Sequence, residues 1–169
     1  NGRLPELKSL SPEVAKVLAQ TRGHLVLNGL TTLSDETAKA LTEDAQNRGD
    51  LYLNGLTTIS PELARAICRR EGDLYLNGLT TISDEALKAL AEHKAHPQHA
   101  KPHVYFNSLT TISDEGAAVL ASWPKWSGEL PALPTLSEQA AAAFASSRKF
   151  SGKLPAVKML SVQTARALA

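Results

Sequence analysis

The sequence predicts an α/β fold of tandem repeats, a solenoid with short parallel strands on one face and helices on the other. Three observations predict it. A six-residue block recurs along the chain, a serine follows each block at a fixed distance, and the apolar period changes from two before the serine to 3.6 after it. Because one unit of this size buries too little apolar surface to offset its ordering cost, only stacked units are expected to fold.

The repeated block is Leu-Asn-Gly-Leu-Thr-Thr or, in one copy, Phe-Asn-Ser-Leu-Thr-Thr. Its four copies start at Leu27, Leu53, Leu76 and Phe106. A serine lies seven residues after each start, and the same frame extends over residues 1–169 with Leu or Ile directly before every serine. We therefore expect a single repeat domain of about seven units, 23 to 30 residues apart and anchored on Ser11, Ser34, Ser60, Ser83, Ser113, Ser137 and Ser161.

A short strand is expected at the start of each unit. Leu25 and Leu27 flank Val26, and the next three units alternate in the same way. This period of two predicts a strand of about three to four residues with one buried face. Equivalent outward residues then form columns across the sheet, since neighbouring strands lie about 4.7–4.9 Å apart.

A helix of two to three turns is expected after each serine. The serine hydroxyl can accept from free backbone N–H groups, and Pro12 and Pro61 occupy the first helical position. Apolar residues four and seven places after the serine, such as Leu87 and Leu90, give each helix one inward stripe.

The first unit and the last two differ from the central four. They carry Leu-Pro in place of the Asn-containing block, with the prolines at Pro5, Pro131 and Pro155. Because proline lacks a backbone donor, strand pairing should be weaker there than in the centre. Trp126 is expected to fill the edge of the layer, whereas Trp123 is either packed or an exposed ligand contact.

One unit carries eight residues in a known order: Leu74, Leu76, Ile82, Ser83, Asp84, Leu87, Leu90 and Ala91. This order resembles the cysteine-containing type of the leucine-rich repeat family, in a bacterial-like variant. The resemblance implies a surface for contacts with other proteins. Leu79 stands where the family has Cys or Asn, and Glu71 where it has a leading Leu. Paired threonines such as Thr80 and Thr81 are therefore expected to bond the turn backbone in place of an asparagine ladder.

Composition excludes some classes of function. The chain has 43% apolar residues, a net charge of +1 and no apolar run of the roughly 18 residues that a membrane span needs, so neither nucleic acid nor a membrane is expected as a partner. The single cysteine, Cys68, permits no internal disulfide and leaves the compartment undetermined. The chain lacks an initiator Met and opens and closes inside repeat units, which predicts a fragment of something longer.

Three outward columns of the central units are the candidate binding surface. Tyrosine with asparagine gives rigid contact area and adaptable hydrogen bonding, which suits a protein or a glycan ligand. The alternative is that these columns only stabilise the sheet and its turns. The candidate residues are Tyr52, Tyr75, Tyr105, Asn54, Asn77, Asn107, Asp50 and Asp73, with His24 and His103 flanking the aspartates.

An insertion over residues 93–103 lengthens one unit. It carries His93, His96, His99 and His103, which are weak candidates for a metal site because the prolines and lysines between them describe a solvated loop. A recognition loop is the other interpretation. No cofactor is expected.

Catalysis has little support, because the repeated serines and glutamates are explained as helix starts and Cys68 has no repeated histidine partner. The sequence thus predicts a non-catalytic module that binds another protein, or a glycan, through the strand face. The alternative is a structural spacer in a longer repeat protein.

Overall fold

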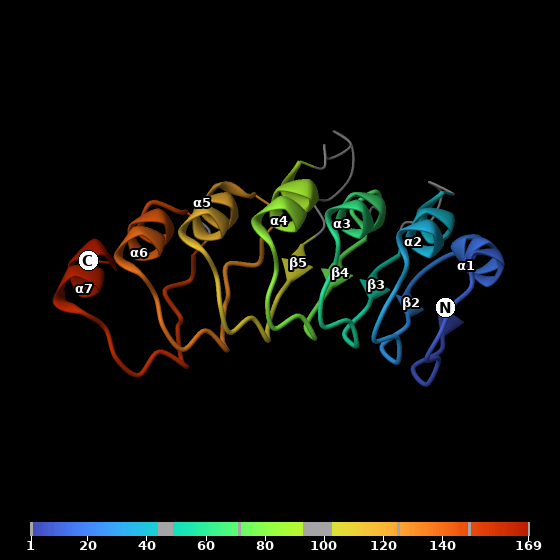
Figure 1. Cartoon of the computed structure of the whole chain (residues 1–169), viewed down its shortest axis with the longest axis horizontal. Helices are drawn as coiled ribbons and strands as arrows, with labels where there is room; N and C mark the ends of the chain where they lie inside the picture. The colour runs from blue at the N-terminus through green and yellow to red at the C-terminus, as the bar shows by residue number, and fades with distance from the viewer. Residues whose placement is uncertain are drawn as a thin grey trace.

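The computed structural model describes residues 2–43, 49–70, 72–92, 103–124, 126–148 and 150–168. Over these ranges the chain is an α/β protein in which strands and helices alternate, and elements that follow each other in sequence lie side by side (Figure 1). The strands form one parallel sheet with the order β1-β2-β3-β4-β5. Their bounds are β1 Gly2–Arg3, β2 Leu25–Val26, β3 Leu51–Tyr52, β4 Leu74–Tyr75 and β5 Val104–Tyr105.

Seven helices are seen in the described ranges, and they lie in a row on one side of the sheet (Figure 1). None of them has the length and apolar character that a membrane crossing requires. Their bounds are α1 Pro12–Ala19, α2 Asp35–Thr42, α3 Pro61–Ile67, α4 Asp84–Ala91, α5 Asp114–Ser122, α6 Glu138–Ala145 and α7 Val162–Leu168.

The strands pair in the register that the repeats predict, with Leu51 opposite both Leu25 and Leu74. The Leu25 and Leu27 N–H groups donate to carbonyls of the following unit at 2.8 and 2.9 Å. Each strand spans two residues and not the expected three to four. The reason is that the Leu27 carbonyl accepts from the Leu30 N–H at 3.2 Å, which turns the chain.

The predicted capping role of the anchor serines is confirmed. Ser60 Oγ, for example, accepts from the Leu63 N–H at 2.9 Å, and Ser161 Oγ accepts from the Thr164 N–H at the same distance. The five remaining anchor serines cap α1, α2, α4, α5 and α6 in the same way. The first turns are also tied together between units, because Ser60 Oγ donates to Asp35 Oδ1 at 2.5 Å.

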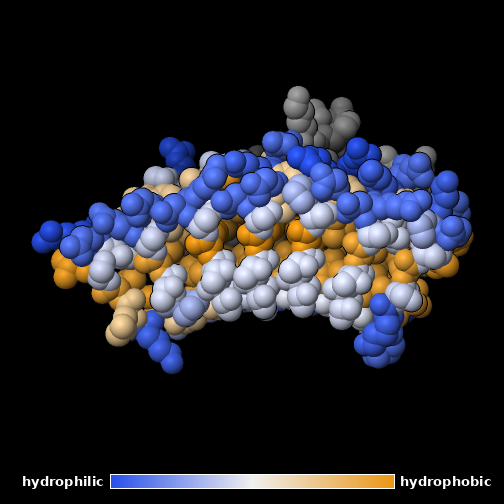
Figure 2. Space-filling view, in the orientation of Figure 1, coloured by the Kyte–Doolittle hydropathy of each residue, from blue (hydrophilic) through white to orange (hydrophobic). Residues whose placement is uncertain are grey.

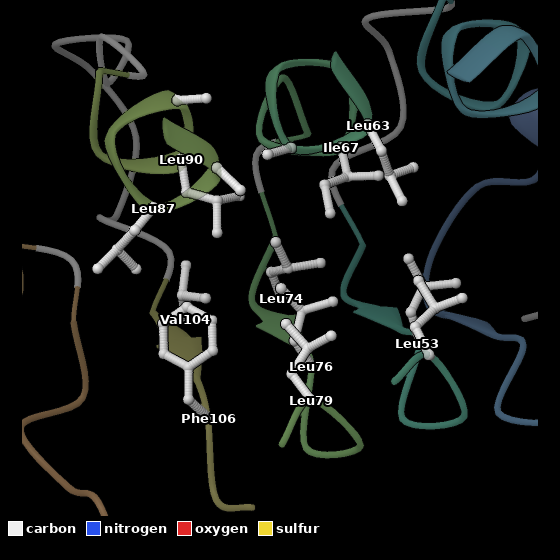
Figure 3. Packing of buried hydrophobic residues seen from close by; sticks show 14 of the residues in the cluster. Leu53, Leu63, Ile67, Leu74, Leu76, Leu79, Leu87, Leu90, Val104 and Phe106 are labelled. Atoms are coloured by element: carbon white, nitrogen blue, oxygen red, sulfur yellow. The ribbon is translucent and has the colours of Figure 1, made fainter. Parts of the chain in front are cut away.

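The core lies between the sheet and the row of helices. Figure 3 shows Leu74, Leu76 and Leu79 on the strand side facing Leu87 and Leu90 on the helix side. All five are at most 4% exposed. Each layer therefore shares its apolar contacts with the next, which is why the units hold together as one stack.

The sheet ends at β5 for a reason that the sequence did not indicate. Gly128 and Gly152 occupy the first strand position of the last two units with φ of 84° and 73°, a left-handed conformation that breaks a strand. Trp126 makes one isolated bridge with Val104, and its fully buried side chain fills the layer. Trp123 is buried as well, so the packed alternative holds for both tryptophans.

Strand pairing is lost in the last two units, as predicted, but is kept in the first, and proline is not the cause. Pro5 lies beyond β1, so its missing N–H does not fall on the ladder, and the Leu4 N–H donates to the Val26 carbonyl at 2.9 Å. Strand pairing is thus lost at the glycines and not at the prolines.

Candidate functional site

Three tyrosine rings stack across the centre of the sheet. Tyr52, Tyr75 and Tyr105 are each the second residue of their strand, and the strands hold them in register. The Tyr52 and Tyr75 ring centroids are 4.2 Å apart with an interplanar angle of 3°, and those of Tyr75 and Tyr105 are 4.7 Å apart at 6°. All three side chains are half-buried. We call this group the tyrosine stack.

The surroundings raise the pKa of two tyrosines of the stack, Tyr75 and Tyr105. Burial raises the pKa of Tyr75 most, and the hydrogen bond with Tyr52 and the nearby charges of the neighbouring tyrosines and Asp73 raise it further. Burial and then the Asp73 charge likewise raise the pKa of Tyr105. Tyr52 Oη donates to Asp50 Oδ2 at 3.3 Å. The surface therefore offers neutral phenols beside carboxylates.

A row of side chains beside the stack bonds the backbone of the next unit. Asp50 Oδ1 accepts from the Asp73 N–H at 3.0 Å, and Asp73 Oδ1 accepts from the His103 N–H at 2.8 Å. The row begins at His24, whose Nδ1 accepts from the Asp50 N–H at 3.2 Å. The same Nδ1 lies 3.0 Å from Asp50 Oδ2, a contact that becomes an ion pair when the imidazole is protonated. We call this row the aspartate ladder.

The asparagines form a second ladder on the other side of the stack, which corrects the expectation from Leu79. Asn28 Oδ1 accepts from the Asn54 N–H at 3.2 Å, Asn54 Oδ1 from the Asn77 N–H at 3.0 Å, and Asn77 Oδ1 from the Asn107 N–H at 3.1 Å. Of the paired threonines in the described residues, only Thr110 bonds another unit, where its Oγ1 donates to the Thr80 carbonyl at 3.2 Å.

The asparagine ladder stops where proline takes over. In the following unit, the position equivalent to Asn107 is Pro131, which has no N–H. The ladder therefore ends at Asn107. In the unit before Asn28, the equivalent position is Pro5, which has no side-chain acceptor for the Asn28 N–H. The ladder therefore covers the three units of the tyrosine stack and the unit of Asn28 before them.

The structure thus brings all eight candidate residues together on one surface, where the ladders use some of their polar groups. Asp50, Asp73, Asn54 and Asn77 each spend one oxygen on backbone. What remains for a ligand is the tyrosine edges, the asparagine NH₂ groups and the second carboxylate oxygen of Asp73, because Asp50 Oδ2 accepts from the Tyr52 hydroxyl. Outside the centre the tyrosine column changes to the exposed charged residues Arg3, Glu129 and Lys153.

Two features of the surface were not found from the sequence. The first is an apolar band along the molecule between polar residues and a paler row at the lower edge (Figure 2). Half-buried Leu or Ile residues directly before the cap serines recur in successive units, at Leu10, Leu33, Ile59, Ile82, Ile112 and Leu136. Their regular place directly before the anchor serines was the available signal in the sequence.

The second feature is Arg70, which is only 6% exposed. Its Nη2 donates to the Gly49 carbonyl at 3.3 Å, whereas Nε and Nη1 have no hydrogen-bond partner. Burial lowers the pKa of Arg70 to about 10, against the opposing effect of the Asp50 charge. No sequence signal marked it, because no other unit has arginine at this position.

The metal hypothesis for the insertion falls largely outside the described residues. His93, His96 and His99 lie in the part of the chain that the structure does not describe. His103 is exposed, and its Nδ1 is 3.9 Å from Asp73 Oδ1. Within the described ranges no three His, Cys, Asp or Glu side chains are grouped so as to hold a metal ion.

A scan of the chain against protein-family models finds no match, and a search of curated proteins finds none either. What the protein binds must therefore be inferred from its own residues.

Proposed function

We propose that this chain is a leucine-rich-repeat solenoid that works as a non-catalytic binding module through the tyrosine stack and its two ladders. The tyrosine stack is the observation that carries the proposal. Its three parallel rings are half-buried, whereas each of the other large aromatic contacts of the described chain involves a buried tryptophan or phenylalanine. The regular strand–helix units and the asparagine ladder support the solenoid and the family.

A rigid aromatic surface favours recognition for an energetic reason. Binding costs less when the contact residues are already ordered, and stacking together with strand pairing fixes these rings before a ligand arrives. Tyrosine edges and hydroxyls combine apolar area with hydrogen bonding. The flanking amides and carboxylates add polar contacts that fix orientation.

The partner we propose is another protein, with a glycan as the second possibility. Asp50 and Asp73 place negative charge beside the stack, which opposes binding of a nucleic-acid backbone. The geometry favours an extended ligand that crosses the strands, because the ring spacing of 4.2 to 4.7 Å repeats along the array.

The non-catalytic part of the proposal rests on how the reactive side chains are used. The anchor serines accept backbone N–H groups at helix starts, as Ser83 does from Ala86 at 3.2 Å. The Cys68 thiol is half-buried and donates to the Arg65 carbonyl at 3.2 Å. Neither arrangement pairs a nucleophile with a base.

A structural spacer is the second candidate function. The observation that favours it is that both ladders already serve the fold, since each aspartate and asparagine step bonds a neighbouring backbone N–H. Under this alternative the tyrosine stack would stabilise the sheet and contact no partner.

A binding screen separates the two candidates. The wild-type chain, Tyr75→Ala and a helix-side control, Lys39→Ala, are applied to displayed peptide libraries and to a glycan array. A recognition module predicts ligands that bind the wild type and Lys39→Ala alike and lose at least about tenfold in affinity, roughly 1.4 kcal/mol, with Tyr75→Ala. If every ligand binds Tyr75→Ala as well as the wild type, the strand face is not the binding surface.

A further inference from the structure

The two aspartates beside the tyrosine stack differ in how their charges are used. Asp50 Oδ2 accepts from the Tyr52 hydroxyl at 3.3 Å and lies 3.0 Å from His24 Nδ1. The buried Arg70 guanidinium is also near, because the Asp50 charge raises its pKa against the larger lowering that burial causes. The negative charge of Asp50 is therefore engaged by groups of the chain itself.

Asp73 has fewer partners. Its Oδ1 accepts from the His103 N–H at 2.8 Å and lies 3.9 Å from His103 Nδ1. Its Oδ2 makes no hydrogen bond with any residue in the described part of the chain. The Asp73 side chain is 29% exposed, so this second oxygen is available to a donor from another molecule.

A third carboxylate adds negative charge at the same end of the tyrosine stack. Burial raises the pKa of Tyr105 most, and the charges of Asp73, Asp50 and Glu129 each raise it further, which places three carboxylates near one phenol. Glu129 is exposed. The nearest arginine of the tyrosine column, Arg3, lies on β1, three strands from β4 and thus about 14 Å away, beyond the Debye length of about 8 Å at physiological ionic strength.

The groups that cross the stack along β4 follow a fixed order. The carboxylate of Asp73 comes first, then the ring of Tyr75, then the amide of Asn77, whose Oδ1 is used in the asparagine ladder and whose NH₂ group remains as a donor. Outward side chains two residues apart on a strand are separated by about 6.6 Å. A lysine or arginine residue has the complementary order of a cationic head, an apolar stem and a backbone carbonyl, over a similar length.

We propose that the partner is an extended peptide segment that presents a lysine or arginine, with the cationic head at Asp73 Oδ2 and the stem across the edges of Tyr75 and Tyr105. The backbone carbonyls of the segment accept from the asparagine NH₂ groups on the other side of the stack. An acidic side chain is repelled by the three carboxylates, and a neutral ligand gains nothing from the Asp73 charge. This inference rests on the proposed function, since it names the ligand of the same surface.

A double-mutant cycle tests the charge contact. Peptides are selected on the wild-type chain from a displayed library, and those that lose affinity with Tyr75→Ala are synthesised in two forms, one as selected and one with its lysine or arginine replaced by glutamine. Both forms are titrated against the wild type and Asp73→Asn. Asparagine keeps an Oδ1 for the His103 N–H, as Asn77 does for the Asn107 N–H, so circular dichroism should show an unchanged fold.

Glu36→Gln is the matched control, because Glu36 is exposed on α2 and its substitution removes the same charge on the helix side. The proposal predicts that Asp73→Asn and the glutamine form of the peptide each weaken binding about tenfold, and that both changes together weaken it little more than either alone. Glu36→Gln should change the affinity less than about twofold. The glutamine peptide measured on the wild type tests the cationic contact without any change in the chain.

Ligands that depend on Tyr75 but bind Asp73→Asn as tightly as the wild type, whether peptides without a basic residue or neutral glycans, would overturn this inference and leave the proposed function standing. Equal losses with Asp73→Asn and Glu36→Gln would also overturn it, because they would reflect the net charge of the chain and not a contact. If no ligand depends on Tyr75, the proposed function fails together with this inference.

Discussion

At the scale of single residues, the asparagine ladder shows how one side chain serves two units. The Asn54 N–H donates to Asn28 Oδ1, and Asn54 Oδ1 accepts from the Asn77 N–H, so Asn54 joins three successive units. The Asn107 N–H likewise donates to Asn77 Oδ1, but the equivalent position in the following unit is Pro131, which offers no N–H to Asn107 Oδ1. Removing the side-chain amide of Asn54 therefore removes a hydrogen bond between units, whereas removing that of Asn107 removes none from the ladder.

Asn54→Ala should lower the free energy of unfolding by about 1–3 kcal/mol, because the Asn77 N–H loses its acceptor in a half-buried place. Asn107→Ala is the matched control and should change it by less than about 0.5 kcal/mol. Urea unfolding followed by circular dichroism measures both. Equal losses for the two variants would mean that the ladder does not contribute to stability.

The raised pKa values of Tyr75 and Tyr105 predict a loss of stability in alkali. The unfolded chain releases phenolic protons near the ordinary value of about 10, whereas the folded chain holds them to higher pH. Between these two values the folded state binds more protons, so the free energy of unfolding falls as pH rises. Below the ordinary value this contribution is fully present.

Tyr75→Phe keeps the ring and removes its titrating group, so the variant should lose less stability than the wild type as the pH rises above about 10. Urea unfolding at several alkaline pH values measures the difference between the two proteins and cancels the titration of the lysines. Parallel curves for wild type and variant would contradict the prediction.

At the scale of elements, neighbouring helices are joined at their first turns. The cap serine of a helix donates to a carboxylate of the preceding helix wherever that helix begins with aspartate. Ser113 caps α5 and also donates to Asp84 of the preceding unit. Ser83 caps α4, but the equivalent position before it is Pro61, which has no carboxylate. The two serines are otherwise alike as N-caps.

Ser113→Ala should therefore cost more stability than Ser83→Ala. Loss of a cap alone costs about 0.5–2 kcal/mol, and Ser113→Ala adds the loss of a hydrogen bond between units to a charged group, about 1.5–3 kcal/mol. Thermal and urea unfolding of the two variants measure the difference. A smaller effect for Ser113→Ala than for Ser83→Ala would show that the link to Asp84 is not stabilising.

The elements also show which parts of the fold can be predicted from sequence. Cap serines and buried leucines follow from local spacing, so their places were predicted correctly. The break in the sheet at Gly128 and Gly152 could not be predicted, because a serine frame counts residues and carries no information on the sign of φ. The threonines were expected to bond the turn backbone because Leu79 stands where leucine-rich repeats have Cys or Asn, whereas the asparagine two residues earlier reaches the next backbone.

At the scale of the whole molecule, the row of repeat units has a regular centre, and the units on either side of it differ from that centre. The tyrosine stack and both ladders coincide in the central units, whereas charged residues and proline occupy the same columns outside them. Arg70 is a single buried charge without an equivalent in other units, and a repeat pattern could not have predicted it. The columns of the candidate surface could be predicted from the sequence. The hydrogen bonds of the two ladders could not, because they depend on how the units are arranged in space.

Oxidative footprinting of the tyrosines tests the central claim most directly. The wild-type chain is labelled with and without a ligand from the binding screen, and modification is read out by mass spectrometry at each residue. The account predicts that Tyr52, Tyr75 and Tyr105 become protected together, since they form one surface. Unchanged labelling of all three, with protection confined to the exposed helix residues, would contradict it.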